Sequence, residues 1–478
     1  MYDVVIVGAG VIGGVLARTL SQFDLKICIL EKENDVAMGA TKANSAIVHA
    51  GFDAKPGSLK ARLNVKGAQK MAALCRELGV KYRRNGSLVL AFTEEEEKTL
   101  GDLLERGREN GVPDLQILSR EALLSLEPNI SPNARCALYA PTGAILCPYE
   151  LTLAAIGNAM DNGADLKRNF EVCAIEKTGE GYALSSSTER VEGRFVVNCA
   201  GLYSDRIAAM IGDTSFRVHP RKGEYVLLDK ECGSLVSATL FQPPSKMGKG
   251  ILVTPTVDGN LLLGPTSVDR EEKEDKSTTP EGLAEVLAKA GLSIKAIPAG
   301  KTITSFCGLR AVGSTGDFIL TAPKPGFINA AGIESPGLSA SPAIAEHIVE
   351  MLQECGLLCR KKEDFSPYRV PMHRFREASI EEKNRMIAEN PAYGKIVCRC
   401  ESVTEGEILD AIRQNPGATD LDGIKRRTRA QMGRCQGGFC GPAVMELLAA
   451  QLQIPCQSVT KSGGNSFMIA GKTKGEQK

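Results

Sequence analysis

The sequence predicts an α/β protein of more than one domain, and three observations lead to this prediction. At 478 residues, the chain is longer than one compact core of ordinary size. A strand, a glycine turn and a helix follow one another at the N-terminus, and the same pattern returns twice later in the chain. Four cysteines are grouped near the C-terminus, where they indicate a separate small domain.

The first segment, YDVVIVGAGVIGGVLARTLSQFDLKICILEKE, predicts a strand, a glycine turn, an amphipathic helix and a second strand. Gly8, Gly10 and Gly13 match the G-x-G-x-x-G spacing of dinucleotide-binding βαβ units. The first permits the tight turn, the second lets the backbone approach a pyrophosphate, and the third lets the helix pack on the strand. Glu31 ends the second strand, where a carboxylate accepts hydrogen bonds from a ribose. The fingerprint predicts a Rossmann-like domain and by itself leaves FAD and NAD open.

Two later segments repeat this pattern. RFVVNCAGLYSDRIAAMIG predicts a strand, a glycine turn and a helix with Asp205 in its first turn. GFINAAGIESPGLSASPAIAEHIVEML predicts a third such unit, with Pro342 in the first turn of its helix. A helix aimed by ESPGLSASP would set its positive end against the pyrimidine edge of a flavin, where charge appears on reduction.

Together with KANSAIVHAGFDAKPGSLKARL, these segments resemble the FAD-dependent oxidoreductases of the D-amino-acid-oxidase superfamily over residues 1 to 355. The similarity is greatest to the branch of glycerol-3-phosphate dehydrogenases and oxidases and L-2-hydroxyglutarate oxidases. The resemblance implies that FAD is the cofactor. The cofactor-binding residues that it implies are Gly8, Gly10, Gly13, Glu31, Lys32, Asn44, Ser45, Val172, Ala200, Gly201, Asp205, Gly332, Gly337 and Leu338.

The resemblance also implies that the FAD-binding domain is interrupted by an α+β substrate domain with an antiparallel sheet. Within residues 1–358, we expect FAD-binding parts at about 1–80, 145–215 and 300–358, and substrate-domain parts at about 81–144 and 216–299. The stretches KGEYVLLDK and GILVTPTVDGNLLLGPTS suit such a sheet, with VDGN as a hairpin turn. A connector (359–392), a small helical domain (393–457) and a tail (458–478) follow, and we expect the end of the tail, GKTKGEQK, to be mobile.

Oxidation of a 2-hydroxy substrate needs a base for the hydroxyl proton and a flavin for the hydride. The chain has four histidines, and they are His49, His219, His347 and His373. His49, in IVHAGF, lies where the resembling family has a histidine beside the flavin that is proposed as the base. We therefore predict that His49 is catalytic, with a structural histidine as the alternative.

An anionic substrate also needs a cation, best supplied by an arginine that makes two hydrogen bonds to a carboxylate or phosphate. Arg310, in FCGLRAVGSTGD, matches the GLR segment that carries the substrate-anion arginine in the family. A phosphate dianion favours additional cations, and the candidates are Arg221, Lys222 and Lys249. In HPRKGEY, the L-2-hydroxyglutarate branch usually has arginine where this chain has Lys222, and this weakens the match to that substrate.

The four late cysteines form two close pairs, with one residue between Cys398 and Cys400 and four residues between Cys435 and Cys440. Thiols as close as the first pair seldom reach disulfide geometry. Four thiolates suit either zinc or a [2Fe–2S] cluster, although short zinc modules usually use C-x2-C spacing. The spacing and the segment GIKRRTRAQMGRCQGGFCGP resemble the bacterioferritin-associated-ferredoxin (BFD) type of domain. This resemblance implies that the four cysteines hold a [2Fe–2S] cluster.

A basic run follows in the same region: Lys425, Arg426, Arg427 and Arg429. Its simplest interpretation is a solvated helix face, and a second is a docking patch for an acidic redox partner. Whether a companion flavoprotein subunit docks there stays open.

Composition argues against several other classes. With 58 Lys and Arg against 57 Asp and Glu, the chain offers no argument for binding nucleic acid or an anionic membrane. The first residues, MYDVVIVGAG, start a strand without the regions of a signal peptide, and no apolar run approaches the roughly 18 to 20 residues that cross a bilayer. We expect a cytoplasmic protein, in which 15 cysteines do not form a disulfide framework and any membrane contact goes through a partner.

A flavin takes two electrons at once, whereas an iron–sulfur cluster passes them singly, so electrons should leave to a protein or quinone acceptor. The lead prediction is an FAD-dependent dehydrogenase that oxidises sn-glycerol 3-phosphate to dihydroxyacetone phosphate. L-2-hydroxyglutarate is the nearest alternative substrate, and a secondary amine is a third. From other classes, the alternatives are a non-catalytic electron-transfer subunit and a flavoprotein with a regulatory zinc module.

Overall fold

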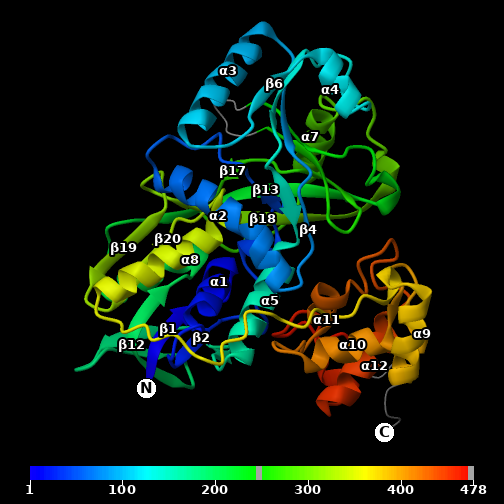
Figure 1. Ribbon diagram of the computed structural model, residues 1–478. Coiled ribbons are helices and arrows are strands. Elements are labelled where there is room, and N and C mark those ends of the chain that lie inside the picture. The colour runs from blue at the N-terminus through cyan, green and yellow to red at the C-terminus, as the bar shows by residue number, and fades with distance from the viewer. Residues whose placement is uncertain (244–249, 472–478) are drawn as a thin grey trace.

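The computed structural model describes residues 1–243 and 250–471, and Figure 1 shows them as three bodies. The N-terminal strands and their helices lie at the lower left, a second sheet with its own helices lies above them, and residues after about 375 form the body at the lower right. The residues from 472 onward, which make up nearly all of the expected mobile end, lie outside the described chain.

The first sheet is built on five parallel strands. In spatial order they are β9 (Asp165–Lys167), β2 (Ile27–Leu30), β1 (Tyr2–Val7), β12 (Arg190–Asn198) and β20 (Phe327–Ala331). Three antiparallel strands extend it, namely β10 (Ala174–Lys177), β11 (Tyr182–Ser185) and β19 (Ile319–Lys324). This arrangement confirms the Rossmann-like fold class, and its inner strand β2 is buried on both faces.

Helices cover both faces of this sheet. Three of them pack together on one face, and they are α1 (Val11–Leu20), α5 (Pro148–Asp161) and α8 (Gly337–Glu354). The longer α2 (Leu59–Glu77) packs on α8, and the short α6 (Ser204–Ala209) lies against the opposite face. Val4 and Ile6 of β1 belong to the first core, whereas Val5 and Val7 belong to the second, as strand alternation requires.

The helix α8 begins earlier than the sequence suggested. It starts at Gly337, so Pro342 lies inside the helix and not in its first turn. Proline cannot donate the backbone hydrogen bond to the carbonyl four residues earlier, which belongs to Leu338. The Ser341 hydroxyl donates to this carbonyl instead, at 2.9 Å, so the helix continues through the proline with its acceptor satisfied.

The second sheet contains nine strands. In order of pairing they are β17 (Val268–Asp269), β13 (Val218–Leu228), β16 (Leu261–Gly264), β15 (Leu252–Pro255), β14 (Thr239–Phe241), β5 (Ser87–Ala91), β7 (Cys136–Ala140) and β6 (Gln116–Leu118), while β18 (Thr302–Gly313) also pairs with β13. Its helices are α3 (Glu94–Glu109), α4 (Arg120–Leu126) and α7 (Pro280–Ala290). All neighbouring strands in this sheet are antiparallel except β14 and β5, which run parallel.

Two details of this sheet bear on the predictions. The stretch with VDGN forms the expected hairpin, because β15 and β16 pair on either side of it and Gly259 takes a φ of +91°. The boundary expected at residue 300 differs, because β18 begins at Thr302 and pairs along almost its whole length with β13. This long strand therefore belongs to the second sheet, although the sequence placed it in the FAD-binding part.

A small third sheet connects the two bodies. It contains β3 (Ile47–Val48), β8 (Ala144–Leu146) and β4 (Tyr82–Arg83), with β8 between the other two. The predicted connector then runs from α8 past the ends of α1 and α5, and it ends with a helix, α9 (Ile380–Glu389).

The C-terminal body has its own apolar core, which includes Ile408, Ile424, Val444 and Leu448. Its elements are β21 (Ile396–Cys398), β22 (Val403–Thr404), α10 (Glu405–Arg413), α11 (Leu421–Thr428) and α12 (Gly441–Leu452). We call this body the C-terminal domain. Within the described part of the chain, none of the helices combines the length and the apolar composition that a membrane span requires.

Candidate active site and cysteine site

A cavity of about 540 Å³ extends from the carboxyl end of β1 to the strands β13 and β18 of the second sheet. Most residues that the sequence singled out for cofactor or substrate line this one cavity. They are Gly8, Gly10, Glu31, Lys32, Asn44, Ser45, His49, Val172, Ala200, Gly201, Arg310, Gly337 and Leu338. The structure thus brings together residues that are up to 330 positions apart in the sequence.

The glycine turn gives the cavity one of its walls. Gly8 has a φ of +106°, which disfavours any side chain, and it leads directly into the N-terminus of α1. A Cβ atom on Gly13 would lie 2.0 Å from the carbonyl oxygen of Gly8, so only glycine lets the helix pack this close to the strand. The first N–H groups of α1 have no partner within the helix, and this suits them to a phosphate.

Glu31 is held in place by the backbone. Its Oε2 accepts from the amide of Ala9 at 2.8 Å, and its Oε1 accepts from the amide of Glu33 at 3.0 Å. Burial raises the pKa of Glu31, while the two amides oppose this shift. The carboxylate is thus fixed at the end of β2 and faces the cavity, as a group that binds a ribose should be.

His49 follows the short strand β3 and lines the cavity. Its backbone N–H donates to Ser339 Oγ at 2.7 Å, and its ring Nε2 lies 3.2 Å from Ser335 Oγ. The ring also lies 5.8 Å, centroid to centroid, from that of Phe241 in the second sheet. The imidazole is therefore positioned by α8 and by the loop before it, at the junction of the two bodies.

Arg310 reaches the cavity from β18. One Nη donates to the carbonyl oxygen of Thr266 at 2.6 Å, while its buried Nε has no hydrogen-bond partner among the described residues. A guanidinium with a spare buried donor is suited to an anionic ligand. Beside it, Tyr225 stacks on Phe306 at 4.7 Å, and its hydroxyl lies 3.3 Å from Ser45 Oγ.

Of the other predicted substrate cations, Arg221 and Lys222 do not line the cavity. Lys222 is 1% exposed, and its Nζ donates to Asp275 at 2.8 Å and to Ser277 at 3.0 Å, so its role as a substrate ligand is not supported. Arg221 makes a bidentate pair with Asp269, at 2.6 and 3.2 Å. Lys249 lies outside the described residues.

Three predicted cofactor residues, Gly13, Gly332 and Asp205, are likewise not among the residues that line the cavity. Gly13 and Gly332 serve close backbone packing, because a Cβ on Gly332 would lie 3.0 Å from Gly313. The carboxylate of Asp205 accepts from Lys273 Nζ at 2.7 Å and from the amide of Val218 at 3.1 Å.

The side-chain partners of Lys222 and of Asp205 lie in one loop, residues 273–277, which we call the strap. The strap comes from the second sheet, and its Lys273 and Lys276 line the cavity. Between them, Glu274 accepts from the hydroxyl of Tyr203. Lys222 and Asp205 therefore anchor a segment that closes part of the cavity.

Sequence reasoning missed several cavity residues, among them Lys42, Lys273, Lys276 and Ser335. Burial lowers the pKa of Lys42 to about 8, and the nearby charges of Arg426 and Lys276 contribute to this shift. Lys42 directly follows Thr41, whose hydroxyl accepts from the amide of Val11 at the start of α1. In the sequence, Lys42 is the first residue of KANSAIVHAGFDAKPGSLKARL, the segment that carries part of the family resemblance, and this signal could have identified it.

The four late cysteines come together as two pairs. Cys400 Sγ lies 3.6 Å from Cys435 Sγ, and Cys398 hydrogen-bonds with Cys440, which lowers the pKa of Cys398 to about 6. Two thiolates on one tetrahedral metal with bonds of about 2.3 Å would lie roughly 3.8 Å apart, close to the observed separation. Backbone amides, such as that of Gln431, point at the sulfurs and favour the thiolate form.

The pairing suits two metal ions with two thiolates each. Among the residues that the structure describes, no group of three or more His, Cys, Asp or Glu side chains surrounds a single point as the ligands of one metal would. A [2Fe–2S] cluster divides its four cysteines between two irons, whereas structural zinc gathers all four around one ion. The residues present therefore fit the cluster.

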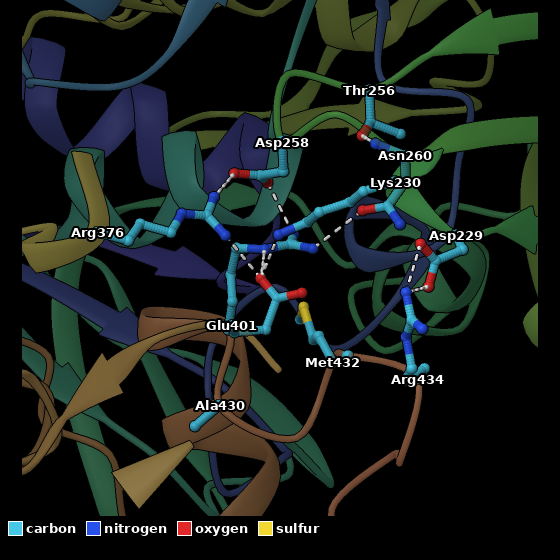
Figure 2. Close-up of polar contacts among 12 residues, drawn as sticks. Asp229, Lys230, Thr256, Asp258, Asn260, Arg376, Glu401, Ala430, Met432 and Arg434 are labelled. Carbon is cyan, nitrogen blue, oxygen red and sulfur yellow. Dashed lines mark hydrogen bonds and ion pairs between the residues drawn. The ribbon is translucent and has the colours of Figure 1, made fainter. Parts of the chain in front are cut away.

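Buried charges hold the C-terminal domain against the second sheet (Figure 2). Glu401, next to Cys400, accepts from Lys230 and Arg376 at 2.7 Å and from Arg429 at 3.0 Å. Asp258, in the β15–β16 hairpin, accepts from Arg429 at 2.8 Å and from Arg376 at 3.3 Å. Burial alone would raise the pKa of both carboxyls, but the surrounding cations lower it below the ordinary range.

A second contact joins the C-terminal domain to the first sheet. Asp35, which is 1% exposed, accepts from Arg426 at 2.7 Å and from Arg427 at 2.8 Å. Together with Arg429, these arginines make up most of the predicted basic run. Both interpretations of that run, a solvated face and a docking patch, are therefore wrong, because the arginines are buried in contacts within the chain.

Comparisons with known proteins agree with this architecture. Residues 3–351 match the family described as FAD dependent oxidoreductase, and residues 396–450 match the family described as BFD-like [2Fe-2S] binding domain. A solved structure, dithionite-reduced L-alpha-glycerophosphate oxidase from Mycoplasma pneumoniae with FAD bound, superposes with a TM-score of 0.74 at 30% identity. The match covers 77% of this chain and 99% of that chain.

Two relatives are similar to the chain in sequence. A protein named glycerol 3-phosphate dehydrogenase from Caloramator mitchellensis is 50% identical over 478 residues, and this covers the whole of both chains. The human protein named L-2-hydroxyglutarate dehydrogenase, mitochondrial, is 35% identical over 284 residues, which is 56% of this chain and 61% of that protein. The first similarity includes the cysteine-bearing domain.

Proposed function

From its membership of the FAD dependent oxidoreductase family, with FAD and a [2Fe–2S] cluster as cofactors, we propose that the chain oxidises sn-glycerol 3-phosphate to dihydroxyacetone phosphate. The observation that carries this proposal is the meeting of His49 and Arg310 in one cavity with the nucleotide-binding turn. Full-length similarity to a relative named glycerol 3-phosphate dehydrogenase supports the choice of substrate.

We assign a separate role in the reaction to each of three residues. We assign to His49 the role of accepting the hydroxyl proton of the substrate, with Ser335 orienting the ring through Nε2. We assign to Arg310 the binding of the phosphate through its spare donors. FAD, when bound, would accept a hydride, and the cluster would transfer electrons one at a time. The electrons then leave to a redox partner protein or a quinone, and any contact with a membrane goes through that partner.

L-2-hydroxyglutarate is the second candidate substrate, because the human relative of that name is 35% identical. Its oxidation would use the same base, and Arg310 would bind a carboxylate in place of a phosphate. The two proposals share the cavity and differ only in the anion.

A visible spectrum of the protein, purified without oxygen, tests the proposal. Glycerol 3-phosphate should bleach the flavin band rapidly, and L-2-hydroxyglutarate added to a fresh sample should not. Bleaching by the hydroxyglutarate alone would overturn the substrate and leave the role of His49 standing. Bleaching by neither would favour an amine substrate or an electron-transfer subunit.

A matched pair of variants tests the anion site. Arg310→Lys keeps the charge and loses the two-pronged hydrogen bonding, so the concentration of glycerol 3-phosphate that half-bleaches the flavin should rise at least tenfold. Arg108→Lys, an exposed residue of α3, serves as the control and should leave it unchanged. Equal behaviour of the two variants would remove Arg310 from the site.

A further inference from the structure

The two cysteine pairs differ sharply in exposure. Cys398 and Cys440 are each 1% exposed and belong to the core of the C-terminal domain. Cys400 and Cys435 are both exposed. A cluster held by these four residues therefore has one edge inside the domain and one edge at the surface.

An aromatic ring and an arginine lie beside the exposed pair. Phe439, one residue before Cys440, is 61% exposed, and the guanidinium of Arg399 lies 5.0 Å from the centre of its ring. Arg399 stands between Cys398 and Cys400, and within the described chain it makes no ion pair. Exposed aromatic and arginine side chains are the residues most enriched at the centres of protein interfaces.

The neighbouring basic residues are engaged elsewhere. Arg426, Arg427 and Arg429 are buried in ion pairs that hold the C-terminal domain to the other two bodies. Arg434 is exposed, but it pairs with Asp229 at 3.3 Å and Glu231 at 3.1 Å. The positive charge of Arg399 is thus the one beside the cysteines that remains available to a partner among the described residues.

We propose that the surface formed by Arg399, Cys400, Cys435 and Phe439 is where an electron-carrier protein with acidic residues around its own redox centre docks and takes up electrons. The proposal rests on the electron exit through the cluster that the proposed function includes. In each encounter the reduced cluster loses one electron and the carrier gains one, while no bond forms and no proton moves. The acidic character of the carrier follows from the unpaired charge of Arg399.

The test measures electron transfer from the holoenzyme to two proteins of opposite charge. The cofactors are reduced chemically with a stoichiometric amount of dithionite, so that the result does not depend on oxidation of the substrate. The reduced enzyme is then mixed with cytochrome b5, an acidic haem protein, or with cytochrome c, a basic one, and haem reduction is followed at several ionic strengths. A short-chain quinone serves as a third acceptor.

Arg399→Glu should slow the reduction of cytochrome b5 about tenfold at low ionic strength and speed that of cytochrome c, because the steering charge is reversed. Both effects should fade as salt is added. Phe439→Ala should slow the reduction of both cytochromes at every salt concentration. Arg108→Glu makes the same charge change on α3, at the far end of the molecule from the C-terminal domain in Figure 1, and should change neither rate.

Visible and electron paramagnetic resonance spectra of each variant must match those of the parent, which shows that the cluster is loaded. Equal rates with cytochrome b5 for Arg399→Glu and the parent would overturn the proposal. So would a chain that reduces the quinone quickly and both proteins slowly, because the surface would then serve a small acceptor. Failure of the proposed substrate would instead appear as no bleaching by glycerol 3-phosphate, with this result unchanged.

Discussion

The two junctions between the bodies of this molecule are built in opposite ways. The first and second bodies share an apolar core, in which Ile47 and Ala50 pack with Leu138 and Phe241. The C-terminal domain instead keeps a core of its own and meets the other bodies through buried carboxylates surrounded by arginines. An apolar core tolerates many sequences of similar volume, whereas a buried charge is costly once a partner is missing. The apolar junction beside the cavity should therefore keep its structure after a single substitution. A single substitution among the buried charges should instead loosen the C-terminal domain.

The largest expected effect is that of His49→Asn, which should lower activity in the cavity and leave the C-terminal domain unchanged. Removing a general base typically lowers the rate of the chemical step by about 10² to 10⁴-fold, so bleaching of the flavin by glycerol 3-phosphate should slow to that degree. The variant should keep its cluster signal, because the cysteines lie in the other domain. Stopped-flow absorbance without oxygen measures both quantities.

His347→Asn is the matched control for this experiment. His347 lies on α8, and its Nδ1 is 3.3 Å from Glu350, so the same substitution there should leave the bleaching rate unchanged. If His49→Asn bleaches as fast as the control, His49 is a structural histidine and the substrate class must be reconsidered.

The next largest effect should fall on docking. Glu401 is 3% exposed, and Glu401→Gln leaves Lys230, Arg376 and Arg429 with too little negative charge around them. Loss of one partner from a buried ion pair costs about 3 to 5 kcal/mol. We expect the C-terminal domain to detach reversibly, so that a protease cuts the connector at least about 100-fold faster, while flavin bleaching is kept.

Glu446→Gln, an exposed position on α12, is the control for this change and should be cut at the parent rate. The pH dependence gives a second check. The pKa values of Glu401 and Asp258 are lowered in the folded chain, so their contribution is complete above the ordinary range near about pH 4 and is lost only as the pH falls below it. Detachment of the parent at neutral pH would contradict this account.

A smaller effect should appear in the binding of FAD. Burial lowers the pKa of Lys42 to about 8 in the protein without FAD, and a diphosphate nearby would favour the charged form. The affinity for FAD should therefore be highest below pH 8 and fall by up to about tenfold per pH unit above it. Isothermal titration of the FAD-free protein between pH 7 and 9.5 measures this slope.

Lys42→Met should bind FAD more weakly and with little dependence on pH in this range. The control, Lys98→Met, changes an exposed lysine of α3 and should retain the slope of the parent. If the parent shows no slope, Lys42 does not contact the diphosphate, and the charge of the strap residues Lys273 and Lys276 becomes the next explanation.

The features that the sequence predicted correctly are those that depend on residues close together in the chain or on a recognisable family segment. The turn at Gly8 and the carboxylate of Glu31 depend on neighbours within one βαβ unit, so spacing alone identifies them. Cys398 and Cys400 were recognisable because two pairs with fixed spacing are rare by chance. His49 and Arg310 were found through family resemblance, and the structure adds that they share a cavity.

The charged residues whose roles were wrongly predicted all depend on contacts between distant segments. Lys222 sits on the strand next to that of Arg310, but its partner Asp275 is 53 residues away in the strap. Arg426 and Arg427 have the composition of a solvated face, and only the position of Asp35, almost 400 residues earlier, shows that they are buried. A charged side chain reveals its role only with its partner, and sequence spacing does not report partners at this distance.

The smallest predicted effect concerns the exposed ion pair at the same junction. Arg434 contacts Asp229 and Glu231, but its side chain is 65% exposed, so water and salt already screen these contacts. Arg434→Ala should therefore change protease cutting of the connector by less than about threefold, in contrast to Glu401→Gln. Raising the salt concentration should remove even this difference. If instead Arg434→Ala releases the domain as fully as Glu401→Gln, burial does not distinguish the ion pairs at this junction, and their number would have to explain how the domain is held.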